Sequence, residues 1–91
     1  MEISLKSALS IHRSGNINDA IRHYHQLLEK NPNNFELLHL LGIAYGQMKD
    51  FTHSLEYLKQ ALISDATHHG LLSNIGTAYK GLNKYNEALD Y

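Results

Sequence analysis

The chain has 91 residues, of which 43% are hydrophobic and 19% charged, and it contains no cysteine. This length allows one domain, and the lack of cysteine excludes a disulfide framework, a thiolate nucleophile and a zinc site with Cys ligands. The formal net charge of −1 and the scattered Lys and Arg residues argue against a nucleic-acid partner. The densest apolar run, residues 37–41, is too short to span a membrane, so we expect a soluble, cytoplasmic protein with no membrane partner.

The first part of the chain predicts two helices joined by a turn at Gly15 and Asn16. The second helix must stop before Pro32, because the proline ring fixes φ and leaves no N–H to donate. Either Asn33 or Asn34 can then cap the helix that follows. Residues before this cap are therefore expected to form one helical hairpin.

A second hairpin is predicted over residues 35–68. Apolar residues at helical spacing form one stripe in residues 37–48 and another in residues 55–62. Lys49 and Asp50 mark the turn between the two stripes.

The third hairpin is expected to begin after the short connection at residues 65–67. We predict its internal turn at Asn83 and Lys84, so that Tyr91 falls inside its second helix. This arrangement predicts an amino-terminal piece of a longer protein, with an uncapped last helix that could also mediate homo-oligomer formation.

An internal repeat supports the three hairpins. A shift of 34 residues aligns Phe35–Tyr57 with His69–Tyr91, and seven of the 23 aligned pairs are identical, where chance at roughly 6% per pair would give one or two. Two units share a signature. In the second unit it reads Leu38-x-x-Leu41-Gly42-x-x-Tyr45, followed by Ser54-x-x-x-Leu58. In the third unit it reads Leu72-x-x-Ile75-Gly76-x-x-Tyr79, followed by Ala88.

This signature resembles the tetratricopeptide repeat (TPR) pattern. The chain is then expected to be one TPR domain, made of the repeats 1–34 and 35–68 and a truncated third repeat, 69–91. The resemblance implies an all-α fold of tandem antiparallel helix-turn-helix repeats, stacked as a right-handed α-solenoid. Small residues are expected where the two helices of a hairpin cross, and Tyr45 and Tyr79 should fill the space between hairpins. The expected small-residue pairs are Ala8 with Ala20, Gly42 with Ser54, and Gly76 with Ala88.

The resemblance also implies a function, since the first helix of each TPR unit lines a concave surface that binds a peptide or helix of a partner protein. The residues at these positions are Leu5, Leu9, His12, His39, Leu40, Ile43, Asn74 and Thr77. Leu5, Leu9 and Leu40 could instead close the core, because apolar residues at helical spacing are usually buried. The clamp by which chaperone-binding repeats hold a terminal carboxylate is excluded, since its five positions hold Leu5, Leu9, Leu40, Gly70 and Asn74.

No catalytic, cofactor or metal site is expected. The seven histidines include no pair four residues apart on a helical face, and the chain lacks a phosphate-binding glycine loop and a close pair of carboxylates. The opening unit contains Ala8-Leu9-Ser10-Ile11-His12-Arg13-Ser14-Gly15, followed by Ala20, Tyr24, Leu28 and Pro32. This pattern resembles repeats that precede glycosyltransferase, sulfotransferase or methyltransferase domains in long bacterial proteins. The alternative function is therefore a recruiting or dimerising arm of a larger enzyme whose catalytic domain follows residue 91.

Overall fold

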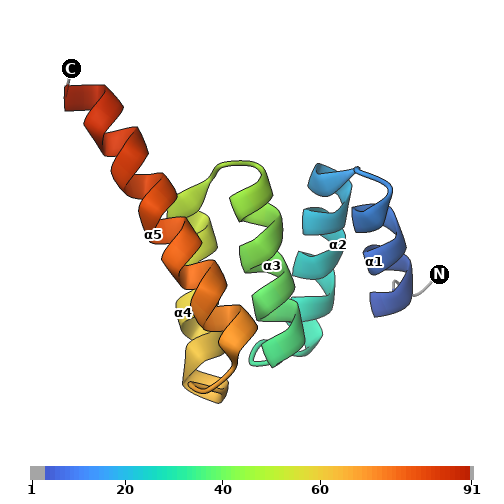
Figure 1. Cartoon of the computed structure of the whole chain (residues 1–91). Coiled ribbons are helices and arrows are strands. Elements are labelled where there is room, and N and C mark those ends of the chain that lie inside the picture. Colours follow the sequence, from blue (N-terminus) through green and yellow to red (C-terminus); the bar gives the residue numbers. More distant parts are fainter. Residues whose placement is uncertain (1–3, 91) are drawn as a thin grey trace.

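The computed structural model describes the backbone of residues 4–90 and the side chains of residues 4–84. Its regular elements are the helices α1 (Leu5–Arg13), α2 (Ile17–Lys30), α3 (Phe35–Gln47), α4 (Phe51–Ser64) and α5 (His69–Asp90). Successive helices reverse direction and stack into an elongated body of 49 × 28 × 19 Å (Figure 1). The predicted all-α solenoid of helical hairpins is thus confirmed. Within the described ranges, no helix combines the length and apolar character that crossing a membrane requires.

The boundary between the first two hairpins follows the sequence signals. Helix α2 ends at Lys30, two residues before Pro32, as predicted. Of the two candidate caps, Asn33 and Asn34, the structure uses Asn34, whose side chain accepts a hydrogen bond of 2.9 Å from the Leu37 N–H.

The turns inside the first two hairpins use the same backbone conformation. Gly15 has a φ of 96° and Lys49 a φ of 62°, and the two residues lie one 34-residue period apart. A left-handed residue reverses the chain tightly after a helix, which is easy for glycine and costly for lysine. Both predicted turns are therefore confirmed.

Two clusters of buried side chains hold the helices together. The first joins α1, α2 and α3 and contains Ala8, Ala20, Tyr24, Leu37, Leu41 and Ala44. The second joins α3, α4 and α5 and contains Leu38, Leu55, Leu58, Ala61, Leu71 and Ala78. Helix α3 contributes to both clusters, which explains why its sequence is apolar on more than one face.

Small residues occupy the helix crossings, as the repeat pattern predicts. Ala8 and Ala20 are fully buried between α1 and α2. In the second hairpin the Ser54 hydroxyl donates a hydrogen bond of 2.6 Å to the Gly42 carbonyl oxygen, so this crossing is both close and polar. The third pair, Gly76 with Ala88, includes a side chain outside those that the structure describes.

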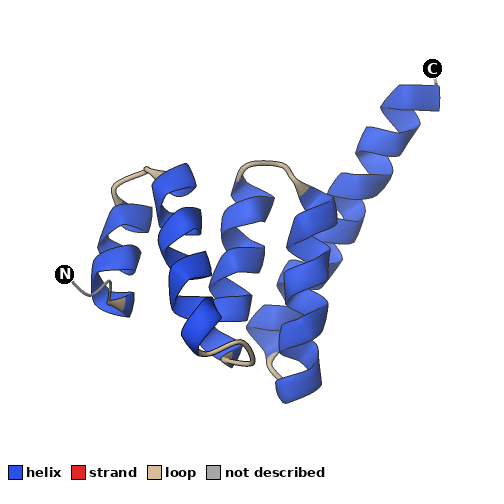
Figure 2. Cartoon of the chain, turned by 180° about the vertical axis from the view of Figure 1, so that it is seen from behind, coloured by secondary structure: helices blue, strands red, loops and turns tan. Residues whose placement is uncertain are grey.

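The third hairpin departs from the prediction. The expected turn at Asn83 and Lys84 is wrong, because α5 continues through both residues to Asp90 and extends past the other helices (Figure 2). A turn there would require a left-handed residue and would break helical hydrogen bonds. The continuous helix instead keeps the backbone hydrogen bonds through this stretch.

Candidate functional site

Helices α1, α3 and α5 carry all eight residues predicted for partner binding. Two side-chain hydrogen bonds connect these helices directly: His12 Nε2 with Gln47 Oε1 at 2.6 Å, and Asn74 Nδ2 with His39 Nε2 at 3.0 Å. Each bond joins residues 35 positions apart, so each links one repeat to the next, although the two bonds use different positions of the repeat. We call the surface formed by the eight predicted residues and Gln47 the α1–α3–α5 face.

His12 is held from two sides at the start of this face. Its Nδ1 lies 2.7 Å from the hydroxyl of Tyr24, whose side chain is fully buried, and the two rings meet edge to face. The Gln47 carboxamide oxygen can only accept a hydrogen bond, so His12 Nε2 donates to it. His12 is therefore an oriented group that ties α1 to α2 and α3.

His39 is at the centre of a second polar cluster on the face. Its Nε2 accepts a hydrogen bond from the Asn74 amide, and its ring lies edge to face against Phe35 and His68, with centroids 5.6 Å and 5.2 Å away. Burial lowers the pKa of His39, and the neighbouring His68 lowers it further. The neutral imidazole is thus the form that this site favours.

The aliphatic residues of the predicted strip divide into two groups. Leu5 and Leu40 pack against the first core cluster, as the alternative interpretation anticipates. Leu9 and Ile43 are half-buried, and neither is among the described side chains that pack against the two clusters. Thr77 is exposed and donates its hydroxyl to the Ser73 carbonyl oxygen at 3.1 Å. Leu9, Ile43 and Thr77 therefore remain available for contact with another molecule.

The sequence interpretation missed the two aromatic neighbours of His39. Phe35 precedes His39 by four residues, so helical spacing alone could have placed the two rings together. His68 lies in the loop before α5, where its Nδ1 accepts a hydrogen bond of 3.0 Å from the Leu71 N–H and so acts as an N-cap. Only the fold brings this ring to His39.

A second aromatic cluster joins the first two hairpins. The rings of Tyr45 and Tyr57 stack with centroids 5.6 Å apart, and the Tyr45 hydroxyl lies 2.9 Å from His25 Nε2. Burial lowers the pKa of His25 and raises that of Tyr45. Tyr45 thus fills the space between hairpins as predicted, whereas Tyr79 remains 42% exposed with the Lys59 amine 5.3 Å from its ring centroid.

The described side chains include no group of three or more His, Asp or Glu residues that could hold a metal ion. Among them, Asp19 forms an exposed ion pair with Arg22, and the Asp50 carboxylate lies 2.7 Å from His53 Nδ1. Both contacts are local to one helix end. The chemistry of the described surface is therefore that of hydrogen-bonding groups, aromatic rings and half-buried aliphatic side chains.

Comparison with known proteins supports the repeat architecture. None of the curated proteins matches the chain. A family described as the TT21 fifth ARM repeats domain matches residues 7–91. ARM repeats are helical repeats related to TPR-like solenoids, and such domains are generally non-catalytic. The chain therefore belongs to the TT21 fifth ARM repeats domain family, a family of helical-repeat proteins.

Proposed function

We propose that this chain is a TPR-type protein-interaction module that binds a peptide or helix of a partner protein on the α1–α3–α5 face. Helical-repeat domains are typical of protein-interaction scaffolds, and the 34-residue period favours the TPR type. The observation that carries the proposal is that Leu9 and Ile43 are half-buried but belong to neither core cluster.

The surroundings of these two aliphatic residues favour binding. The hydrogen bonds of His12 with Gln47 and of His39 with Asn74 hold the polar side chains of the face in place before a partner arrives. Because these side chains are already ordered, binding of a partner causes a smaller loss of conformational entropy. Covering what remains exposed of one aliphatic side chain contributes on the order of 1 kcal/mol to binding.

The test compares the same substitution on two faces. Ile43→Asp places a charge on the α1–α3–α5 face, whereas Ile63→Asp places it on α4, where the native side chain is 88% exposed. With both variants confirmed as folded by circular dichroism, we expect Ile43→Asp to lose the proteins that the wild-type chain retains from a cell lysate. Ile63→Asp should retain them. Equal retention by the two variants would exclude the α1–α3–α5 face as the binding surface.

A recruiting or dimerising arm of a larger enzyme would use the same helices. No feature of the described residues favours that arrangement over a free-standing interaction module.

Self-association through the open side of α5 is a second candidate function. Leu72 and Tyr79 are 44% and 42% exposed, and a Cβ built on Gly76 between them would meet no atom within 4 Å. The equivalent positions in the second repeat, Leu38 and Gly42, are buried beneath α4. The double variant Leu72→Glu with Tyr79→Glu is expected to stay monomeric in analytical ultracentrifugation at concentrations where the wild type associates. A wild type that is monomeric throughout rules this function out.

A further inference from the structure

A hollow of about 610 Å³ lies between α5 and the turn that joins α3 to α4. It is lined by Lys49, Phe51, Thr77, Lys80, Gly81 and Lys84. Lys80, Gly81 and Lys84 follow Thr77 by three, four and seven positions, so the four α5 residues lie on one side of the helix. Only Thr77 belongs also to the α1–α3–α5 face, so the hollow is a separate surface feature.

Gly81 makes room for the apolar wall of this hollow. A Cβ built on Gly81 would lie 2.5 Å from Cζ of the Phe51 ring, closer than two carbon atoms can approach. The lack of a side chain therefore lets the Phe51 ring lie directly against α5. The half-buried ring provides an apolar surface among the amines that surround it.

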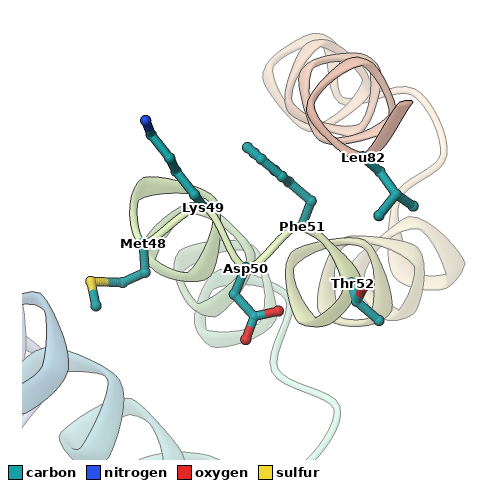
Figure 3. A pocket seen from close by; sticks show the side chains of 6 residues that line it. All are labelled: Met48, Lys49, Asp50, Phe51, Thr52 and Leu82. Carbon is teal, nitrogen blue, oxygen red and sulfur yellow. The ribbon is translucent and has the colours of Figure 1, made fainter. Parts of the chain in front are cut away.

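The described charged residues that line the hollow are of one sign. Three of its lining residues are lysines, and no carboxylate is among the lining residues that the structure describes. In Figure 3 Lys49 and Phe51 project to one side of the turn and Asp50 to the other. There the Asp50 carboxylate lies 2.7 Å from Nδ1 of His53. Among the side chains that the structure describes, these three lysines give the hollow a local positive potential on a chain whose net charge is −1.

From this charge and shape we infer that the hollow binds an acidic peptide segment of a partner protein, with carboxylates on the lysines and an apolar side chain on Phe51. Lysine amines sit on long flexible stems and act as point charges, which suits several carboxylates spread along a peptide. An extended peptide also alternates its side chains between two directions, so acidic and apolar groups can contact different walls.

The inference does not depend on partner binding at Ile43, and it is tested with a defined probe. The probe is a short, blocked, fluorescent peptide in which glutamates flank one leucine, and its binding to the 91-residue chain is followed by anisotropy at about 0.15 M salt. We expect Lys80→Gln with Lys84→Gln to weaken binding about tenfold. The control Lys30→Gln with Lys59→Gln removes the same charge from exposed positions elsewhere and should leave binding unchanged.

Further outcomes separate specific binding from general attraction. A peptide with glutamine in place of glutamate should not bind, and Ile43→Asp should bind the acidic probe as the wild type does. In NMR spectra of the wild type, the probe should shift the backbone amides of Phe51 and Gly81 most. Equal weakening by the two lysine pairs, or no binding of the probe, would overturn the inference. Binding of inorganic phosphate without binding of the peptide would likewise exclude a carboxylate-bearing partner.

Discussion

At Lys49 the backbone adopts a φ of 62°, a left-handed conformation that costs a residue with a Cβ about 1–2 kcal/mol. The equivalent turn in the first hairpin uses Gly15, which adopts such an angle without that cost. Glycine would therefore fit the turn at position 49 better than lysine. Lys49 is also one of the residues that line the hollow beside α5.

At this scale we predict that Lys49→Gly stabilises the fold by up to about 1 kcal/mol, since the relief of the strained backbone exceeds the added entropy of the unfolded chain. Urea denaturation measures the difference. The control Gln60→Gly, at an exposed position inside α4, should destabilise by about 1 kcal/mol. A destabilised Lys49→Gly variant would show that the lysine side chain stabilises the fold by more than the strained backbone destabilises it.

At the scale of the helices, two glycines at equivalent repeat positions have opposite surroundings. A Cβ on Gly42 would overlap the Leu58 side chain, because α4 crosses α3 there and Ser54 bonds to the Gly42 carbonyl. A Cβ on Gly76 in α5 would meet nothing within 4 Å. The packing of α3 on α4 thus requires a glycine at position 42, whereas no contact of α5 requires one at position 76.

Two alanine substitutions test this contrast directly. Gly42→Ala is expected to destabilise by about 1–3 kcal/mol, because the added methyl forces the two helices apart. Gly76→Ala is expected to stabilise by roughly 0.5–1 kcal/mol, because alanine restricts the unfolded chain and fits the helix without a clash. Thermal denaturation of both variants beside the wild type measures the signs. A loss of stability in Gly76→Ala would mean that this side of α5 is covered in solution.

At the scale of the whole molecule, histidines connect successive hairpins. His25 on α2 lies 2.9 Å from the Tyr45 hydroxyl on α3, and His39 on α3 bonds to Asn74 on α5. Burial lowers the pKa of both histidines below the usual value of 6.5. The folded state therefore binds fewer protons than the unfolded state when the pH falls through that value.

We accordingly predict that the free energy of unfolding is constant from about pH 7 to about pH 9 and falls as the solution is acidified through pH 6.5 towards the lowered pKa values. Urea denaturation at a series of pH values gives the slope. His39→Gln should reduce the slope, whereas the control His69→Gln, at an exposed residue in the first turn of α5, should leave it unchanged. A slope unaffected by His39→Gln would remove this histidine from the explanation.

The sequence by itself determined the first four helices and the two hairpins that they form. These features depend on local signals: Pro32 cannot continue α2, one of two adjacent asparagines caps α3, and Gly15 supplies a left-handed turn. Apolar spacing in α3 likewise predicted burial of Leu38 and Leu41 without knowledge of their neighbours. Each signal acts within a few residues, so it can be interpreted from the chain alone.

Only the tertiary structure decided which predicted residues remain available. Leu40 and Ile43 both follow the helical pattern, yet Leu40 packs on the core and Ile43 does not. The continuous helix through Asn83 and the lysines gathered around Phe51 were equally beyond local signals. These outcomes depend on the packing of side chains that are distant in the sequence, and the energy of such packing depends on which helices meet and at what spacing.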